Sequence, residues 1–172
     1  VETAALEAGI TFFDTAESYG ESESLLGWAL RGRRAGAVIA TKFSHAHPDK
    51  ARASLDASLT RLGTDYIDLW QLHKPDPAVP VEDTLGVIAD AIRAGKVREG
   101  GCSNFSAAQL AAAADAARLK AYPAYASVQN ELSILNQQAA DVVTWCGAHG
   151  VAFLPYFPLA AGLLSGKYRQ GR

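Results

Sequence analysis

The 172-residue sequence has no methionine and only two cysteines, Cys102 and Cys146. Two cysteines so placed provide neither a disulfide framework nor the spacing of a metal site, so a reducing, cytoplasmic location is expected. The initiator methionine is absent, and a helical pattern is already running over residues 1–6. We therefore expect the sequence to be part of a longer protein.

The sequence also lacks a strong charge of one sign and a long apolar run. Its 16 basic and 18 acidic residues give a net charge of -2, which argues against a nucleic acid or a membrane surface held by bulk electrostatics. No run approaches the roughly 18 apolar residues of a spanning helix, and no charged-then-apolar leader opens the chain. With 49% hydrophobic and 20% charged residues, we expect residues 1–172 to form a single soluble domain.

What the sequence does contain is a regular alternation of strand and helix patterns. Apolar runs typical of strands begin near residues 10, 37, 66, 97, 126 and 151, about 30 residues apart. Helical patterns lie between them, at residues 21–31, 48–62, 82–94, 107–119 and 137–149. Pro48 suits a first helical position, and Ser106 suits an N-cap. This repeat predicts parallel strands joined by crossover helices.

Two architectures fit such a repeat, an open doubly wound sheet and a (β/α)8 TIM barrel. No Gly-x-Gly-x-x-Gly motif opens a helix, which argues against the open sheet. The polar residues of interest follow strands at their carboxyl ends, where barrels keep their sites. A complete barrel needs about 250 residues. The sequence therefore predicts a (β/α)8 barrel of about six βα units, with the first and last strands missing.

Four candidate catalytic residues follow three successive strands. Residues 10–14 are expected to form a buried strand that ends at Asp14, and a polar loop after it carries Tyr19. Lys42 and His73 stand at the ends of the next two strands. Taken singly, each residue also has a purely structural explanation. Asp14 would cap the following turn, and Tyr19 would be a half-buried aromatic. Lys42 would be a solvated charge, and His73 a histidine whose hydrogen bonds are satisfied. Their shared rim favours a catalytic reading.

These side chains suit the protonation of a carbonyl oxygen. A free tyrosine has a pKa of about 10, and a neighbouring ammonium is expected to lower it. An aspartate would keep the lysine charged and oriented, and an imidazole would position the carbonyl oxygen. No side chain donates hydride, so a nicotinamide cofactor is required.

The later strand ends offer groups suited to that cofactor. Ser103, Asn104 and Gln129 supply hydroxyl and amide groups for a carboxamide, although Ser103 is nearly as well explained as a polar loop start. Tyr156 offers a flat face on which a nicotinamide ring could stack. The glycine- and alanine-rich segment 158–167 could approach a pyrophosphate, with Lys167 to neutralise it.

Taken together, these motifs resemble those of the aldo-keto reductases. The resemblance rests on Asp14-Thr15-Ala16 with Tyr19-Gly20, Thr41-Lys42-Phe43, Tyr66-Ile67-Asp68-Leu69 leading to His73, Cys102-Ser103-Asn104-Phe105, Gln129-Asn130-Glu131, and Tyr156-Phe157-Pro158-Leu159 with Gly162-Leu163-Leu164 and Gly166-Lys167-Tyr168. It covers essentially the whole chain in order. The sequence is most similar to the bacterial and plant-type branches, which include potassium-channel β-subunit-like proteins.

The resemblance implies NADPH-dependent reduction of a small-molecule carbonyl substrate without a metal. It makes Tyr19 the general acid, tuned by Lys42 and Asp14, with His73 orienting the substrate. It implies cofactor contacts, to NADP(H), from Ser103, Asn104, Gln129, Tyr156, Phe157, Pro158, Leu159 and Lys167.

The sequence departs from the family pattern in several places. Leu132 stands where many relatives carry tyrosine, and Phe157 replaces a frequent serine. The first barrel strand and everything after the seventh are lacking, so two open edges are expected to make the chain associate or dissolve poorly. Two rival interpretations remain: a cofactor-sensing regulatory subunit and an inactive truncated homologue. No residue argues for a particular oligomeric state.

Overall fold

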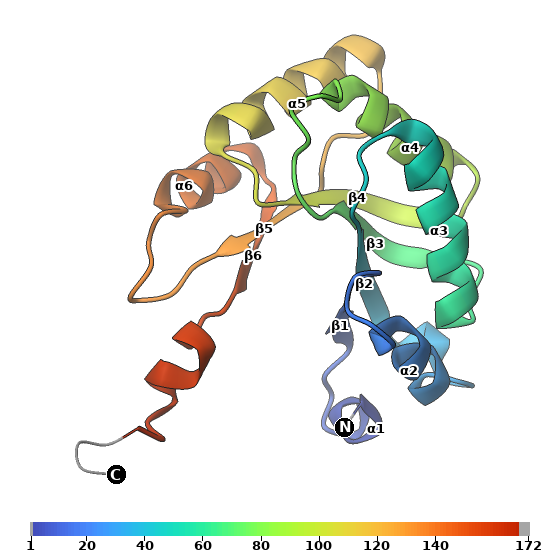
Figure 1. The fold of residues 1–172 in the computed structure, drawn as a ribbon, viewed down its shortest axis with the longest axis vertical. Coiled ribbons are helices and arrows are strands. Elements are labelled where there is room, and N and C mark those ends of the chain that lie inside the picture. The colour runs from blue at the N-terminus through green and yellow to red at the C-terminus, as the bar shows by residue number, and fades with distance from the viewer. Residues whose placement is uncertain (1, 169–172) are drawn as a thin grey trace.

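The computed structural model describes residues 2–168, and for residues 2 and 3 it describes the backbone alone. Within this range, six parallel strands form one sheet in sequence order. The strands are β1 (Phe12–Asp14), β2 (Val38–Phe43), β3 (Ile67–Leu72), β4 (Val97–Ser103), β5 (Ser127–Glu131) and β6 (Ala152–Tyr156). Figure 1 shows the sheet curled into an arch with helices along its outer side. The predicted architecture, part of a (β/α)8 barrel, is confirmed.

The helices follow the expected alternation. They are α1 (Glu2–Glu7), α2 (Ser22–Ala29), α3 (Pro48–Leu62), α4 (Val81–Arg93), α5 (Ala107–Lys120) and α6 (Ala140–His149), with 3-10 turns η1 (Arg34–Gly36) and η2 (Ala160–Ser165). Pro48 is the first residue of α3, as predicted. Ser106 caps α5 in a capping box with Gln109, whose side chain accepts from the Ser106 N–H over 2.9 Å. Among the described residues, no helix is long and apolar enough to cross a membrane.

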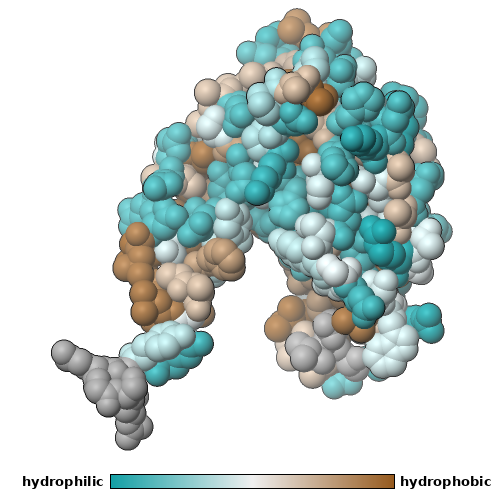
Figure 2. Space-filling view, in the orientation of Figure 1, coloured by the Kyte–Doolittle hydropathy of each residue, from teal (hydrophilic) through white to brown (hydrophobic). Residues whose placement is uncertain are grey.

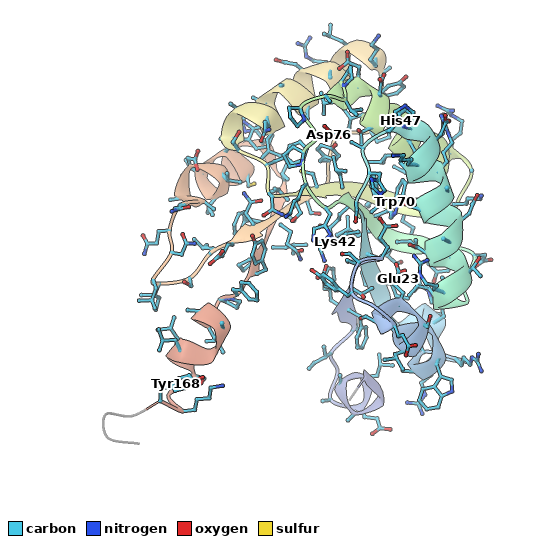
Figure 3. All side chains as sticks on the ribbon, in the orientation of Figure 1. Glu23, Lys42, His47, Trp70, Asp76 and Tyr168 are labelled. Carbon is cyan, nitrogen blue, oxygen red and sulfur yellow. The ribbon has the colours of Figure 1, made fainter. Side chains whose placement is uncertain are left out.

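The apolar core lies between the outer face of the sheet and the helices. Trp70 and Phe43 stack there with ring centroids 4.0 Å apart, and both are buried. In Figure 3, Trp70 is directed toward the helices and Lys42 toward the inner side of the arch. Successive residues of a strand alternate between the two faces, so the inner face is free to carry polar groups.

The prediction that residues 10–14 form a buried strand is wrong in its burial. The strand covers Phe12–Asp14 only, and Ile10 and Phe12 are 55% and 42% exposed. Among the described strands, β1 lies at the edge of the sheet beside β2, and its residues Phe12 and Asp14 are exposed. Exposed apolar side chains gather toward both ends of the arch (Figure 2). Ile10 and Phe12 lie at the end formed by β1, and Ile134 and Leu163 lie at the end formed by β6 and η2.

The amino ends of the strands are tied by a separate polar network. Asp68 on β3 accepts from Arg34 Nη2 over 2.6 Å and from the N–H of Ile39 on β2 over 2.9 Å. The guanidinium groups of Arg34 and Arg98 lie 4.0 and 4.5 Å from the ring centroid of Tyr66. This network joins neighbouring strands at the amino end of the barrel, opposite the end where such barrels hold their sites, and we assign it to stability.

A buried carboxylate joins α2 to α3 and β2. Glu23 on α2 is fully buried, and it accepts from Thr41 Oγ1 and from Arg61 Nε, each over 2.6 Å. Close beside it, α2 approaches α3 at Gly27. A Cβ added there would lie 2.3 Å from the carbonyl oxygen of Leu62. The two helices therefore meet at a distance that only glycine allows.

We expect Gly27→Ala to destabilise the protein by about 1–3 kcal/mol, because the new methyl group overlaps backbone atoms of α3. Gly147→Ala is the matched control, since Gly147 also lies in a helix but has no atom near an added Cβ. That variant should gain up to about 1 kcal/mol from helix propensity. Urea unfolding of the two variants measures both effects, and equal stabilities would contradict the helix contact.

Candidate active site

The predicted catalytic side chains come from the carboxyl ends of the first three strands. Asp14 ends β1, Lys42 lies near the end of β2, and His73 directly follows β3. Backbone bonds extend the ladder past the strands, with the Thr15 N–H donating to Ala40 O over 2.9 Å and the His73 N–H donating to Phe43 O over 2.9 Å. The loop between β1 and α2 carries Tyr19 over this edge of the sheet.

Lys42 and Asp14 form an ion pair in which the lysine is buried and the aspartate is partly exposed. Lys42 Nζ donates to Asp14 Oδ2 over 2.6 Å and to the carbonyl oxygen of Thr15 over 2.8 Å. The lysine side chain is 1% exposed and the aspartate side chain 30%. Burial lowers the pKa of Lys42, while the charge and the hydrogen bond of Asp14 oppose this shift. Asp14 is thus the group that favours the charged lysine.

Tyr19 lies over this pair, half exposed to solvent. Its ring centroid is 5.2 Å from Lys42 Nζ and 5.8 Å from the centroid of the His73 ring, which stands nearly perpendicular to it. The expectation of a lowered tyrosine pKa is wrong for this arrangement. Partial burial raises the pKa of Tyr19, followed by the negative charge of Asp14 and then by Tyr156. The lysine ammonium does not outweigh these effects.

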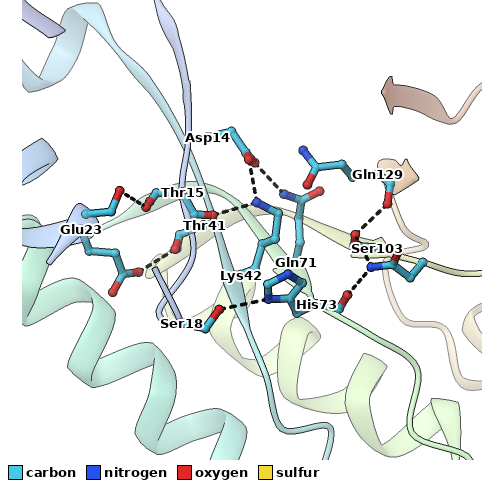
Figure 4. Close-up of polar contacts among 12 residues, drawn as sticks. Asp14, Thr15, Ser18, Glu23, Thr41, Lys42, Gln71, His73, Ser103 and Gln129 are labelled. Carbon is cyan, nitrogen blue, oxygen red and sulfur yellow. Dashed lines mark hydrogen bonds and ion pairs between the residues drawn. The ribbon is translucent and has the colours of Figure 1, made fainter. Parts of the chain in front are cut away.

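His73 completes the group. Its Nδ1 lies 3.5 Å from Ser18 Oγ, and its carbonyl oxygen accepts from Asn104 Nδ2 over 2.9 Å (Figure 4). Burial lowers the pKa of His73, and the positive charges of Lys42 and Lys74 lower it further, against Asp14 and Glu17. The imidazole is therefore neutral near pH 7. A Ser18 hydroxyl that donates to Nδ1 leaves the ring proton on Nε2.

The residues predicted to hold a carboxamide form a continuous set of hydrogen bonds. Asn104, in a left-handed conformation with φ of 62°, donates to Ser103 Oγ over 3.0 Å and accepts from the Tyr156 hydroxyl over 2.8 Å. Ser103 Oγ donates to the backbone oxygen of Gln129 over 2.7 Å. Asn104 thus connects the backbone of His73 with the ring of Tyr156.

The remaining predicted cofactor residues lie outside this group. Phe157, Pro158 and Leu159 follow β6 on the segment that leads into η2, with exposed side chains at Phe157 and Leu159. Phe157 has a φ of 53°, a conformation unfavourable for a bulky residue. Lys167 is exposed, with its Nζ 5.0 Å from the ring centroid of Tyr168.

Two contacts of the group were not among the predicted residues. Gln71 Nε2 donates to Asp14 Oδ1 over 3.5 Å, and Ser18 reaches the His73 ring. Gln71 interrupts an apolar strand run two positions before His73, which was a usable signal. Ser18 carries none. Within residues 2–168, no three His, Cys, Asp or Glu side chains come close enough to hold a metal ion.

The fold and the site together define a partial (β/α)8 barrel with a polar group at the carboxyl ends of its strands. A family model described as the aldo/keto reductase family matches residues 1–172, and the chain belongs to that family. It is 37% identical to the aldo-keto reductase YhdN of Bacillus subtilis over 182 aligned residues, covering 97% of this chain and 53% of that protein.

Solved structures agree with this assignment. The thermostable aldo-keto reductase Tm1743, in complex with the inhibitor epalrestat, superposes with a TM-score of 0.87 at 34% identity, over 96% of this chain and 61% of that one. An aldo-keto reductase of Klebsiella pneumoniae in complex with NADP and acetate gives 0.86 at 29% identity, over 99% and 61%. The chain spans about half the length of the curated relatives it matches.

We expect His73 to make stability depend on pH. Its pKa is lowered in the folded protein, so the unfolded chain binds this proton first as the pH falls through about 6.5. The free energy of unfolding should therefore decrease from about pH 7 to pH 5. In His73→Gln that decrease should be smaller. Urea unfolding between pH 5 and pH 7 measures this decrease in both proteins. A comparison of their free energies of unfolding at pH 8 separates it from the stability that His73→Gln loses with the contacts of the imidazole.

Proposed function

We propose that this protein reduces aldehydes or ketones to alcohols with NADPH, with Tyr19 as the proton donor. The observation that carries the proposal is the convergence of four side chains. Lys42 is bonded to Asp14 over 2.6 Å, and its ammonium lies 5.2 Å from the Tyr19 ring, which packs edge-on against His73. The family supports the reaction class.

Each side chain has a distinct task in this proposal. The Tyr19 hydroxyl, kept protonated by its raised pKa, donates its proton to the carbonyl oxygen as negative charge develops there. Lys42, held by Asp14, stabilises the phenolate that remains. The neutral His73 ring donates from Nε2 to the same oxygen and orients the carbonyl. A bound NADPH supplies the hydride that the carbonyl carbon accepts.

The residues of the inner face fit a nicotinamide. Ser103 and Asn104 already donate their side-chain hydrogens within the protein, so their oxygens would accept from a carboxamide N–H, and the Gln129 amide would donate to its oxygen. Tyr156 is only partly buried, and its hydroxyl is fixed to Asn104, so its ring is available for stacking. Phe157, Pro158, Leu159 and Lys167 would follow the pyrophosphate. Two structures of aldo-keto reductases from Klebsiella pneumoniae, at 29% and 31% identity to this chain, were solved with NADP and with NADPH.

We expect Tyr19→Phe to lower turnover of a reactive aromatic aldehyde by at least about 100-fold, because it removes the proton donor and keeps the ring. NADPH oxidation, followed by absorbance, measures the rate. The dissociation constant for NADPH, measured by fluorescence, should stay the same. Equal turnover in the two proteins would contradict the assignment of Tyr19.

The same measurements separate the rival functions. A wild-type protein that binds NADPH without turnover would favour a cofactor-sensing regulatory subunit. A protein that neither binds nor turns over would favour an inactive homologue.

We expect Tyr156→Ala to weaken NADPH binding about fivefold to tenfold, because a stacked aromatic pair contributes on the order of 1 kcal/mol. Tyr156→Phe keeps the ring and loses only the bond to Asn104, so it is the matched control and should bind NADPH within about twofold of the wild type. Fluorescence titration checks both. Equal binding by the alanine and phenylalanine variants would exclude stacking on this residue.

A further inference from the structure

Gln71 is a fully buried polar side chain beside the lysine of the site. It lies on β3, and its Cα pairs in register with Lys42 on β2 and with Gly101 on β4. Residues in register on parallel strands project to the same face of a sheet. Gln71 therefore projects, like Lys42, toward the inner side of the arch.

The amide of Gln71 contacts the oxygen of Asp14 that the lysine does not. Its Nε2 donates to Asp14 Oδ1 over 3.5 Å, whereas Lys42 Nζ donates to Oδ2 over 2.6 Å. Figure 4 shows both side chains directed at the carboxylate. Each carboxylate oxygen thus has its own donor, and the two donors come from neighbouring strands.

Packing does not explain a glutamine at this position. The Oε1 atom of Gln71 is buried and has no hydrogen-bond partner within the described part of the chain. An unpaired buried carbonyl is unfavourable, and methionine or leucine would fill a similar volume without it. The amide is therefore retained at a cost, and its contact with Asp14 is the gain that accompanies it.

The absence of charge on the amide also suits this contact. A second ammonium here would compete with Lys42 for the carboxylate, and a second carboxylate would repel Asp14. A neutral amide donates to Asp14 and leaves the positive charge of the site on Lys42 alone.

The neighbouring strand leaves room for this side chain. A Cβ on Gly101 would lie 3.0 Å from Gln71 Cγ and 2.6 Å from Ser127 Oγ, so a larger residue would displace both. Ser127 Oγ is likewise buried without a partner among the described residues. It lies in the same layer of the barrel as Gln71 but makes no bond to the ion pair.

We propose that Gln71 is a positioning residue, which holds the Asp14 carboxylate in the orientation where its other oxygen binds Lys42. Gln71 touches neither substrate nor cofactor in this role and acts through Asp14 and Lys42. Its effect on the reaction rests on the proposed function, but its hold on Asp14 does not.

The test compares Gln71→Met, which removes the amide at similar length, with Ser127→Ala, which removes the unpaired hydroxyl of the same layer. NMR of 13C-labelled lysine measures the pKa of Lys42, with Lys42→Arg to assign its signal. Without the amide, the Asp14 carboxylate turns away from Lys42. Because Asp14 raises the pKa of Lys42, that pKa then falls. We expect the Lys42 pKa to fall by at least about half a unit in Gln71→Met and to stay unchanged in Ser127→Ala.

Turnover is measured on the same proteins. In Gln71→Met, kcat should fall about tenfold, since a displaced catalytic group slows the reaction, while the dissociation constant for NADPH stays the same. An unchanged Lys42 pKa in folded Gln71→Met, or an unchanged kcat in that variant, overturns the proposal. If Gln71→Met does not fold, Gln71→Leu takes its place. A wild type without turnover refutes the proposed function, and the titration still decides whether Gln71 holds Asp14.

Discussion

The ion pair between Lys42 and Asp14 is the constraint on which the rest of the site depends. A lysine that is 1% exposed loses nearly all of its hydration, and only a close counter-charge with further hydrogen bonds makes its charged form tolerable in the interior. Asp14 and the carbonyl oxygen of Thr15 supply these partners. Both belong to β1 and its loop, so the shortest strand of the sheet, which lies at an exposed edge, provides the acceptors for a fully buried ammonium. Loss of Asp14 would leave the buried ammonium of Lys42 without a counter-charge.

The register of the parallel strands arranges the polar groups into layers around that pair. Lys42, Gln71 and Gly101 are paired across β2, β3 and β4, and Ser103 is paired with Gln129 one step nearer the carboxyl ends. The residues between them, such as Trp70, project to the opposite face and pack under the helices. One alternation along each strand therefore separates the apolar core from the polar inner face. The hydrogen bonds that Asp68 accepts at the amino ends of the strands stabilise the same register at the opposite end of the barrel.

The sequence allowed much of this arrangement to be predicted, because its main features are local. A period of two along a strand and the position of a strand's end place Asp14, Lys42 and His73 on one rim, and caps such as Ser106 follow from neighbouring residues. What could not be predicted depends on residues far apart in the chain. The exposure of Phe12 depends on what covers the inner face, and the bond between Asn104 and Tyr156 joins residues 52 positions apart. The contact of Gln71 with Asp14 requires the exact pairing of three strands. The pKa of Tyr19 depends on its burial and then on the charge of Asp14, both of which raise it, and no motif encodes these effects.

The raised pKa of Tyr19 keeps its hydroxyl protonated but also makes it a weaker acid, so the proposed transfer requires a neighbour that stabilises the phenolate. A donor must hold its proton until negative charge develops on the substrate oxygen, and burial together with Asp14 keeps the Tyr19 hydroxyl protonated. The neutral His73 adds no charge to the site, and the charge of Lys42 is balanced by Asp14. The site is then nearly neutral before the reaction. In the proposed reaction, negative charge develops on the carbonyl oxygen, and Tyr19 supplies the proton that neutralises it. Lys42 acts after the transfer, when its ammonium faces a phenolate instead of a phenol.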